Sequence, residues 1–178
     1  MTVNIETLLT TFFSNSHQYP AFLNRAKEGK ITRDENPVSH FCSYMGIFDP
    51  VTKEVFMGHH KKANKWLFNG GHIDKDELPL RAALRELYEE VGLRLTDHDL
   101  IGPSLINHIT IPPSTKFTCR EHYHIWYFVP VRKAQINLQH PELQKEFFKN
   151  QWLTLSEAMN ITTDDTNKEA LDWLSLWH

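Results

Sequence analysis

Three glutamates lie within five consecutive positions, and carboxylate oxygens at that spacing can hold a divalent cation. They are Glu86, Glu89 and Glu90. At about 100° per residue, a helix would gather the three side chains within an arc of roughly 100°. Mg²⁺ binds carboxylates together with substrate phosphates, so one chemistry that fits is metal-dependent phosphate chemistry. The alternative is a solvated acidic helix face, since like charges at this spacing cost only a few tenths of a kcal/mol per pair.

The residues around these glutamates predict the helix that would position them. Pro79 suits a first helical turn, and Gly92 suits a left-handed C-terminal cap. Arg85 precedes Glu89 by four positions and can pair with it. A predicted glycine turn, Gly70-Gly71, opens the stretch. Apolar residues at three- and four-residue spacing define a buried face beside the glutamates, formed by Leu80, Ala83, Leu84, Leu87 and Val91. We therefore expect the three carboxylates to emerge, partly buried, at the edge of a cleft.

The stretch from Gly71 to Leu93 resembles the complete Nudix box. The matching fixed positions are Gly71, Glu77, Arg85, Glu86, Leu87, Glu89, Glu90, Gly92 and Leu93. The flanking pattern extends the resemblance to residues 38–175. The resemblance implies a Nudix hydrolase: an α/β/α sandwich with a mixed sheet, which hydrolyses a nucleoside diphosphate linked to another group X. It also implies a divalent metal cofactor, Mg²⁺, with Mn²⁺ able to substitute.

The resemblance also implies roles for single residues. The metal ligands would be Glu86, Glu89 and Glu90, with the backbone carbonyl of Gly71, or else Gly70, adding one more. Arg85 would belong with Glu86 and Glu89 to the catalytic residues and would orient Glu89. The structural residues of the box would be Gly70, Glu77 and Gly92, of which Glu77 would brace the box loop or reach the metal through water. The catalytic base stays open: Glu86 or Glu89 serves in some relatives, and others use a downstream carboxylate. The downstream candidates are Glu121, Glu142 and Glu146.

A basic tract ahead of the box is the candidate contact for substrate phosphates. His59, Lys61 and Lys62 belong to it, and a solvated loop is the alternative interpretation. Aromatic residues suited to base stacking are Phe117, Tyr123 and Trp126, although a core role is more usual for such residues. Family signatures for particular substrates are not clean here, since Pro112-Pro113 comes late for one and Tyr123 is distant for the other. The substrate class is a small nucleotide diphosphate, and its identity is not predicted.

Two other functions are compatible with the same fold. An isopentenyl diphosphate isomerase would need a cysteine in a Cys-Cys-Ser-His context, and the nearest stretch here, residues 40–43, lacks that pattern. A non-catalytic Nudix domain that senses a ligand would often lack some box glutamates, and this chain keeps all of them. Hydrolysis is therefore the favoured prediction.

His122 and His124 share one face of the most strand-like stretch, residues 122–131, and could suit a transition metal. A His-x-His pair without a third ligand is more often a core or pocket feature. The chain has eleven histidines, but no other ligand spacing is evident. We therefore expect this pair to line a pocket or the core.

The whole chain fits one α/β domain over residues 1–178. Its 178 residues, 40% of them apolar and 23% charged, are ordinary for a soluble globular protein. A net charge of −3 disfavours a general nucleic-acid surface. Two cysteines give no disulfide framework, and no signal peptide or membrane-spanning run is evident. We therefore expect a cytoplasmic protein.

Alternating patterns predict the remaining elements. Residues 1–35 form a helical extension, with helices at 4–14 and 21–27, that would pack on the core or on a partner subunit; a homodimer is compatible with this. A helical turn is expected near 142–148, a helix start at 155–159 and a closing helix at 167–177. Strands are expected at 38–48, 53–58, 65–68, 100–111 (broken by Pro103), 122–131 and 151–153.

Overall fold

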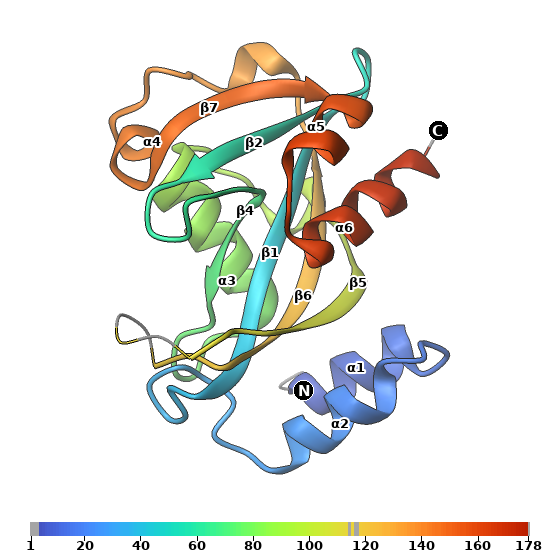
Figure 1. Cartoon of the computed structure of the whole chain (residues 1–178). Helices are drawn as coiled ribbons and strands as arrows, with labels where there is room; N and C mark the ends of the chain where they lie inside the picture. Colours follow the sequence, from blue (N-terminus) through green and yellow to red (C-terminus); the bar gives the residue numbers. More distant parts are fainter. Residues whose placement is uncertain (1–3, 114, 116–117, 178) are drawn as a thin grey trace.

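A seven-stranded mixed sheet forms the centre of the molecule in the computed structural model, which describes residues 4–113, 115 and 118–177. The strand order is β3-β2-β1-β6-β5, with β4 paired to β1 and β7 paired to β2 (Figure 1). The central pair β1 and β6 is parallel, and the other pairs are antiparallel. The strands are β1 (Ser39–Asp49), β2 (Glu54–His60), β3 (Lys65–Leu67), β4 (Asn69–His72), β5 (Ile101–Thr110), β6 (Glu121–Pro130) and β7 (Phe147–Thr154).

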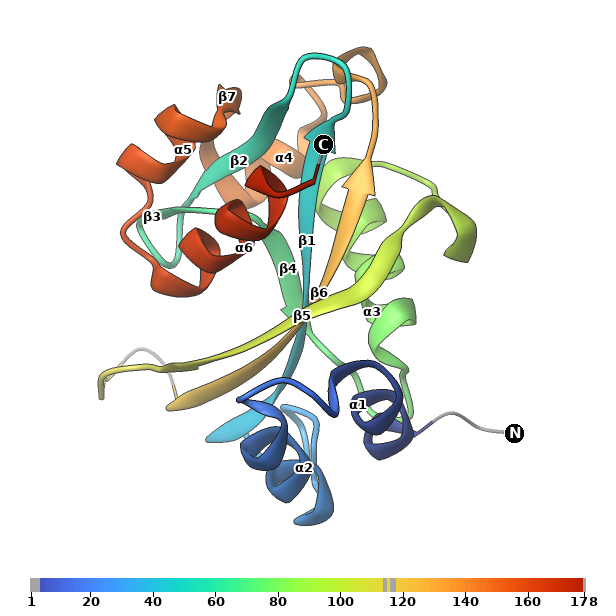
Figure 2. The same ribbon diagram turned by 90° about the vertical axis from the view of Figure 1, so that its right-hand side faces the viewer.

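Helices cover both faces of this sheet, which confirms the predicted α/β/α sandwich (Figures 1 and 2). On one face lie α3 (Pro79–Glu86) and the π-helical turn η1 (Leu87–Val91). On the other face lie α5 (Leu155–Ile161) and α6 (Asp165–Ser175). Each face therefore has its own apolar cluster. The remaining short helices are η2 (Asp97–Asp99), η3 (Lys133–Gln135) and α4 (Pro141–Glu146).

The two N-terminal helices, α1 (Ile5–Phe13) and α2 (Tyr19–Lys27), form a hairpin at one end of the sheet (Figure 2). The Asn4 side chain accepts a hydrogen bond from the Thr7 amide and caps α1. Apolar side chains of both helices join the cluster that also contains the box helix. The predicted helical extension is therefore present, and within this chain it packs on the core.

Alternation along β1 and β6 separates two kinds of surface. Odd-numbered residues of both strands, such as Phe41 and Ile125, are buried in the cluster beneath α3. Even-numbered residues share the opposite face. Toward the C-terminal ends of β1 and β6, Phe48, Trp126 and Phe128 pack beneath α6. Toward the N-terminal ends of the two strands the same face is polar, since it carries His40, Cys42, Tyr44, His122 and His124.

Three local predictions need correction. Gly70 and Gly71 lie in strand β4 and pair with Tyr44 and Ser43, so they do not form a turn. Pro103 does not end its strand; it lies within β5 where the register to β6 shifts. The last turn of the box helix is a π-helix, which changes the direction of the side chains it carries.

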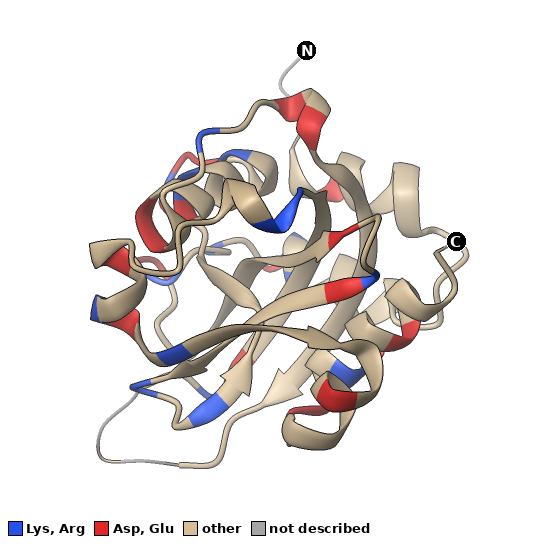
Figure 3. Cartoon of the chain, turned by 90° about the horizontal axis from the view of Figure 1, so that it is seen from above, with Lys and Arg blue, Asp and Glu red and all other residues tan. Residues whose placement is uncertain are grey.

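Charged residues of both signs are interspersed over the helices and loops (Figure 3). Among the described residues, no helix combines the length and the apolar character that crossing a membrane requires.

Candidate active site

A cleft of about 1260 Å³ opens beside the box helix. Its wall combines box carboxylates, the polar end of the β1–β6 face and residues from the start of α6. Two groups of side chains dominate it. We call Glu86, Glu89 and Glu90 the carboxylate cluster. We call His40, Cys42, His72 and His122 the imidazole–thiol cluster; three of these four residues, all but His40, line the cleft.

Glu90 is the most buried member of the carboxylate cluster, with 7% of its surface exposed. Its Oε2 accepts hydrogen bonds from the Asn69 side-chain amide at 3.0 Å and from the Gly70 amide at 3.3 Å. Burial, followed by repulsion from Glu86, raises the pKa of Glu90 to about 8. A buried carboxylate next to another one is therefore held protonated unless a cation compensates the charge.

Glu86 lies against the backbone of Gly71. A methyl group at Gly71 would come within 2.1 Å of the Glu86 carboxylate oxygen, so only glycine leaves room for this arrangement. Burial also raises the pKa of Glu86, and Glu89 and Glu77 add repulsion. The absence of a side chain at Gly71, in β4, therefore leaves the space that the Glu86 carboxylate of α3 occupies.

Arg85 connects the carboxylates to strand β4. Its guanidinium donates to Glu77 through two nitrogens at 2.9 Å, to Glu86 at 2.8 Å and to Glu89 at 3.1 Å. It also donates to the His72 carbonyl oxygen at 2.9 Å. The hydrogen bonds that Arg85 donates to Glu77 raise the pKa of Arg85 further above its usual value, so this cation is permanent. The predicted pairing of Arg85 with Glu89 is present, within a wider network.

The three glutamates differ in burial. Glu89 is 54% exposed, Glu86 is 14% exposed and Glu90 is buried. The sequence predicted three partly buried carboxylates, and adjacent helical positions such as 89 and 90 point in directions about 100° apart.

Glu77 also accepts from the Asp74 amide at 3.0 Å, in addition to both bonds from Arg85. This geometry is that of a loop brace.

Only part of the predicted basic tract reaches the cleft. Lys62 lines it, but His59 and Lys61 do not. His59 stacks on Trp66 with ring centroids 5.6 Å apart, and the Lys61 ammonium donates to the Gln144 carbonyl oxygen. Alternation along β2 explains this outcome for His59, because its neighbour His60 points to the cleft. Two further basic residues of the lining, Arg33 and Lys65, were not predicted.

The downstream candidates for the catalytic base also divide. Glu142 and Glu146 line the cleft, while Glu121 lies outside it and is 3.7 Å from His108. Among the aromatic candidates, Trp126 is fully buried and Tyr123 packs against the core, and Phe117 lies outside the described residues. The aromatic residues that do line the cleft are Tyr44 and Phe68.

Sequence reasoning missed the imidazole–thiol cluster. We expected His122 and His124 to have no third ligand nearby, yet His40, Cys42 and His72 surround His122. The period-two pattern His40-x-Cys42 was visible, but the strand register that joins it to β6 was not. His124 turns instead toward Asn107, its Nδ1 lying 3.2 Å from the amide oxygen.

The fold and this box-lined cleft define a member of the Nudix class. The family model described as "NUDIX domain" matches residues 43–174, which are 132 of the 178 residues. The chain therefore belongs to the NUDIX domain family.

Curated relatives match over shorter segments. The chain is 48% identical over 48 residues to an RNA pyrophosphohydrolase of Francisella philomiragia, covering 27% of this chain and 31% of that protein. It is 34% identical over 77 residues to the m7GpppN-mRNA hydrolase NUDT17 of Danio rerio, covering 43% and 26%. The chain thus matches about a third or less of each relative's length.

Solved structures share the fold. The dihydroneopterin triphosphate pyrophosphohydrolase of E. coli superposes with a TM-score of 0.62 at 20% identity, over 75% of this chain and 92% of that one. A C. elegans Ap4A hydrolase gives 0.51 at 18% identity, over 76% and 96%. At these identities the likeness supports the fold alone.

Proposed function

We propose that the chain is a metal-dependent hydrolase that cleaves the diphosphate linkage of a nucleoside diphosphate joined to another group X. One observation carries the proposal: Glu90, which is buried, and Glu86, which is 14% exposed, both have raised pKa values and face a large cleft beside a permanent Arg85 cation. Two buried carboxylates are costly unless a cation offsets their repulsion. Hard oxygen ligands of this kind suit Mg²⁺, with Mn²⁺ as a substitute.

Glu86, Glu90 and the exposed Glu89 would hold the metal, with the Gly71 carbonyl, or that of Gly70, as the backbone candidate. When bound, Mg²⁺ neutralises phosphate oxygens and lowers the pKa of bound water. The protein's own residues fix the ligands: Asn69 and the Gly70 amide orient Glu90, and Arg85 orients Glu86 and Glu89. We assign Glu77 to bracing, because Arg85 and the Asp74 amide engage its carboxylate.

The substrate class follows from charge and space. Lys62, Lys65 and Arg33 line the cleft and would face phosphate oxygens on the side away from the metal. A volume of about 1260 Å³ accommodates a nucleotide with a further group. The relatives are named an RNA pyrophosphohydrolase and an m7GpppN-mRNA hydrolase. Their names favour a nucleotide substrate of the same class for this chain.

The catalytic base is assigned among residues that line the cleft. Glu89 is our first choice, because it is exposed toward solvent and held at the end of the Arg85 network. Glu142 and Glu146 are the downstream alternatives, and Glu146 is already 3.4 Å from the Lys62 ammonium. Glu121 is set aside because it does not line the cleft.

A hydrolysis screen tests the proposal. The full chain is incubated with nucleoside diphosphate derivatives, dinucleoside polyphosphates and 5′-triphosphorylated or capped RNA, each with Mg²⁺, with Mn²⁺ and with chelator. We expect metal-dependent release of phosphate or nucleotide from one substrate class. Glu90→Gln should reduce that turnover by more than roughly 100-fold, because partners that merely orient ligands already account for about 10–100-fold.

Glu169→Gln is the matched control, since Glu169 is an exposed glutamate of α6 that does not line the cleft. It should keep full activity. Equal turnover by Glu90→Gln and the wild-type chain, with equal circular dichroism, would refute the assignment. Nucleotide binding without any turnover would identify the chain as a ligand sensor instead.

A further inference from the structure

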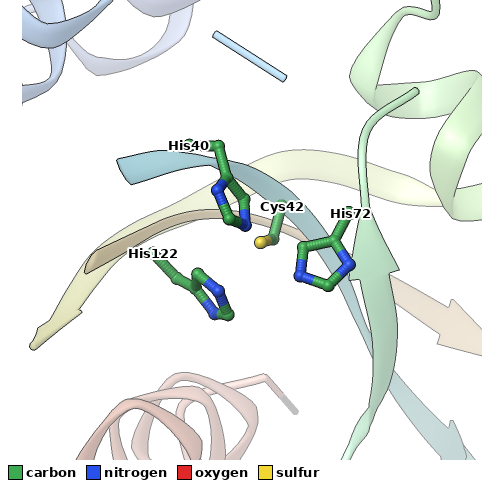
Figure 4. A group of neighbouring side chains, drawn as sticks. All are labelled: His40, Cys42, His72 and His122. Carbon is green, nitrogen blue, oxygen red and sulfur yellow. The ribbon is translucent and has the colours of Figure 1, made fainter. Parts of the chain in front are cut away.

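We propose that the imidazole–thiol cluster is a second metal site, built for a zinc-class transition metal and separate from the carboxylate cluster. Its four ligands would be imidazole nitrogens of His40, His72 and His122 and the sulfur of Cys42. Figure 4 shows the four side chains converging on one point from three strands.

Strand register brings the four residues together. His40 lies opposite His122 in the parallel pair β1–β6, and Cys42 lies opposite His72 in the antiparallel pair β1–β4. Positions 40 and 42 share a face of β1 because side chains alternate. The cluster thus lies near the strand ends of β1, β4 and β6, and ligands carried by strands are held more precisely than ligands carried by loops.

The distances are close to those of a metal shell. One ligand atom from each residue lies within 4.8 Å of all the others. The three imidazole centroids are 4.7 Å, 4.8 Å and 5.3 Å apart. Tetrahedral zinc with N and S ligands at about 2.0–2.3 Å places neighbouring ligand atoms about 3.3–3.8 Å apart. Side-chain shifts of about 1 Å would therefore close the shell.

Neighbouring groups orient two of the ligands. The Nδ1 of His40 lies 2.9 Å from the Asn36 carbonyl oxygen, which fixes its tautomer. Its Nε2 lies 3.9 Å from the Cys119 sulfur, a weak contact that a metal bond would replace. The Nε2 of His122 is buried and has no hydrogen-bond partner among the described residues. An unpaired buried nitrogen costs free energy that a metal bond would recover.

Metal binding would change the protonation of one ligand. Burial raises the pKa of the Cys42 thiol, and Cys119 adds to this effect. Binding would therefore break the S–H bond of Cys42, form a sulfur–metal bond and release one proton to solvent.

Ligand chemistry separates the two clusters. Nitrogen and thiolate ligands favour zinc and cobalt over Mg²⁺, whereas carboxylates and phosphates favour Mg²⁺. The alternative is that the three histidines merely pack on one another. Three facing imidazoles beside a buried thiol would then gain only ring contacts, and the His122 nitrogen would stay unpaired.

Cobalt(II) titration of the full chain tests the site, because cobalt reports ligand type and geometry in its absorption spectrum. The titration is run in excess Mg²⁺ so that hard carboxylate sites are filled. We expect one equivalent of Co²⁺, intense tetrahedral visible bands and a near-ultraviolet thiolate-to-cobalt charge-transfer band. Zn²⁺ should displace the cobalt and remove both features.

Variants assign the ligands. Cys42→Ser should abolish the charge-transfer band, and His122→Ala should weaken cobalt binding by roughly 10–100-fold or more. His98→Ala is the matched control, since His98 is exposed, and it should keep the full spectrum. Cys119→Ser tests the other thiol, whose sulfur lies 3.9 Å from the Nε2 of His40; it should keep the charge-transfer band, because Cys42 supplies the sulfur ligand. Glu90→Gln should keep it too, which separates this test from that of the proposed hydrolase.

The wild-type chain alone can overturn the proposal, whatever the variants do. A titration without the thiolate band, or with only the weak bands of six-coordinate cobalt, would refute the site. Loss of the band in Cys119→Ser with its retention in Cys42→Ser would assign the metal elsewhere and refute it equally.

Discussion

The carboxylate cluster and the imidazole–thiol cluster belong to the same part of the fold but are built in opposite ways. The first comes from one continuous helix of oxygen ligands, and Arg85 clamps it. The second comes from three strands and carries nitrogen and sulfur. Gly71 and His72, adjacent in β4, each touch one of them: Gly71 faces Glu86, and His72 faces His40.

The difference teaches how one cleft can hold two kinds of cation chemistry. A helix places ligands three and four positions apart, so a short motif suffices. A sheet places ligands from distant segments side by side through register, so no motif appears. Hard and soft ligand sets that do not mix would allow each cluster to select its own metal. The predictions below test this separation, from the largest expected effect to the smallest.

Gly71→Ala should damage the carboxylate cluster most. The added methyl group would displace the Glu86 carboxylate, and a misplacement of about 1 Å can cost roughly 100-fold in rate. We expect Mg²⁺-dependent turnover to fall by about that factor. Gly29→Ala is the control: nothing lies within 4 Å of the new methyl group, so its left-handed φ of 70° should lower stability but leave the activity of the folded chain unchanged. Full activity in Gly71→Ala would show that Glu86 is not needed where it lies.

Arg85→Lys should reduce turnover at the carboxylate cluster while leaving cobalt binding at the imidazole–thiol cluster nearly unchanged. Lysine keeps the charge but cannot reproduce the forked contacts to Glu77, Glu86 and Glu89. Turnover should fall by about 10–100-fold, the usual cost of losing an orienting partner. Cobalt affinity of the imidazole–thiol cluster should change by less than about threefold, because only the His72 carbonyl loses a bond. Equal losses in both measurements would show that the clusters act as one.

Stability should respond to pH in opposite directions at the two clusters. Burial raises the pKa of Glu90 from 4.5 to about 8, so its contribution to stability is full below pH 4.5 and is lost as pH rises through 8. Burial lowers the pKa of His122 from 6.5 to about 2, so its contribution is full above pH 6.5 and is lost as pH falls. Thermal midpoints measured in chelator should therefore decline on both sides of mildly acidic pH.

Two variants test that assignment limb by limb. Glu90→Gln should lessen the decline at alkaline pH alone, to which Glu86 also contributes. His122→Asn should lessen the decline at acidic pH alone, to which His72 and His124 also contribute. Mg²⁺ should restore the thermal midpoint of the wild-type chain at alkaline pH, since a cation offsets the carboxylate charge. A smaller decline at acidic pH in Glu90→Gln would contradict the independence of the two clusters.

Lys62→Ala should have the smallest effect. Lys62 lines the cleft but is 69% exposed, and exposed charges contribute little. We expect the KM for the diphosphate substrate to rise by about threefold, with kcat unchanged. Lys61→Ala is the matched control, because that ammonium binds the Gln144 carbonyl oxygen outside the cleft. A larger rise in KM for Lys61→Ala than for Lys62→Ala would show that Lys61, and not Lys62, lies beside the substrate phosphates.

The box helix could be predicted because its signals are local, whereas the sandwich was implied by the resemblance to the Nudix box. Pro79 starts α3, and Gly92 ends η1 with a left-handed φ of 76°. The apolar stripe needed only helical periodicity. The π-helical turn could not be predicted, because nothing in the spacing of Glu89 and Glu90 marks a wider turn.

The strand-borne residues of the cleft could be predicted only in part. His122 and His124 were correctly placed on one face, but their neighbours depend on which strands pair and in what register. His59 was misplaced because the tract was treated as a loop, whereas β2 continues through His60 and alternation decides which side chain points inward. Contacts between distant segments are the part of the cleft that a single sequence does not reveal.

The parallel pairing of β1 with β6 also has a kinetic consequence. Ser39 pairs with Glu121, 82 residues later, so a long loop must close before this central ladder forms. Such non-local pairing slows folding relative to local helices. A metal held by His40 and His122 would join the two strands across that loop and would bind only after closure. We therefore expect Zn²⁺ to slow unfolding much more than it speeds folding, because the metal stabilises the folded state after the rate-limiting step of folding.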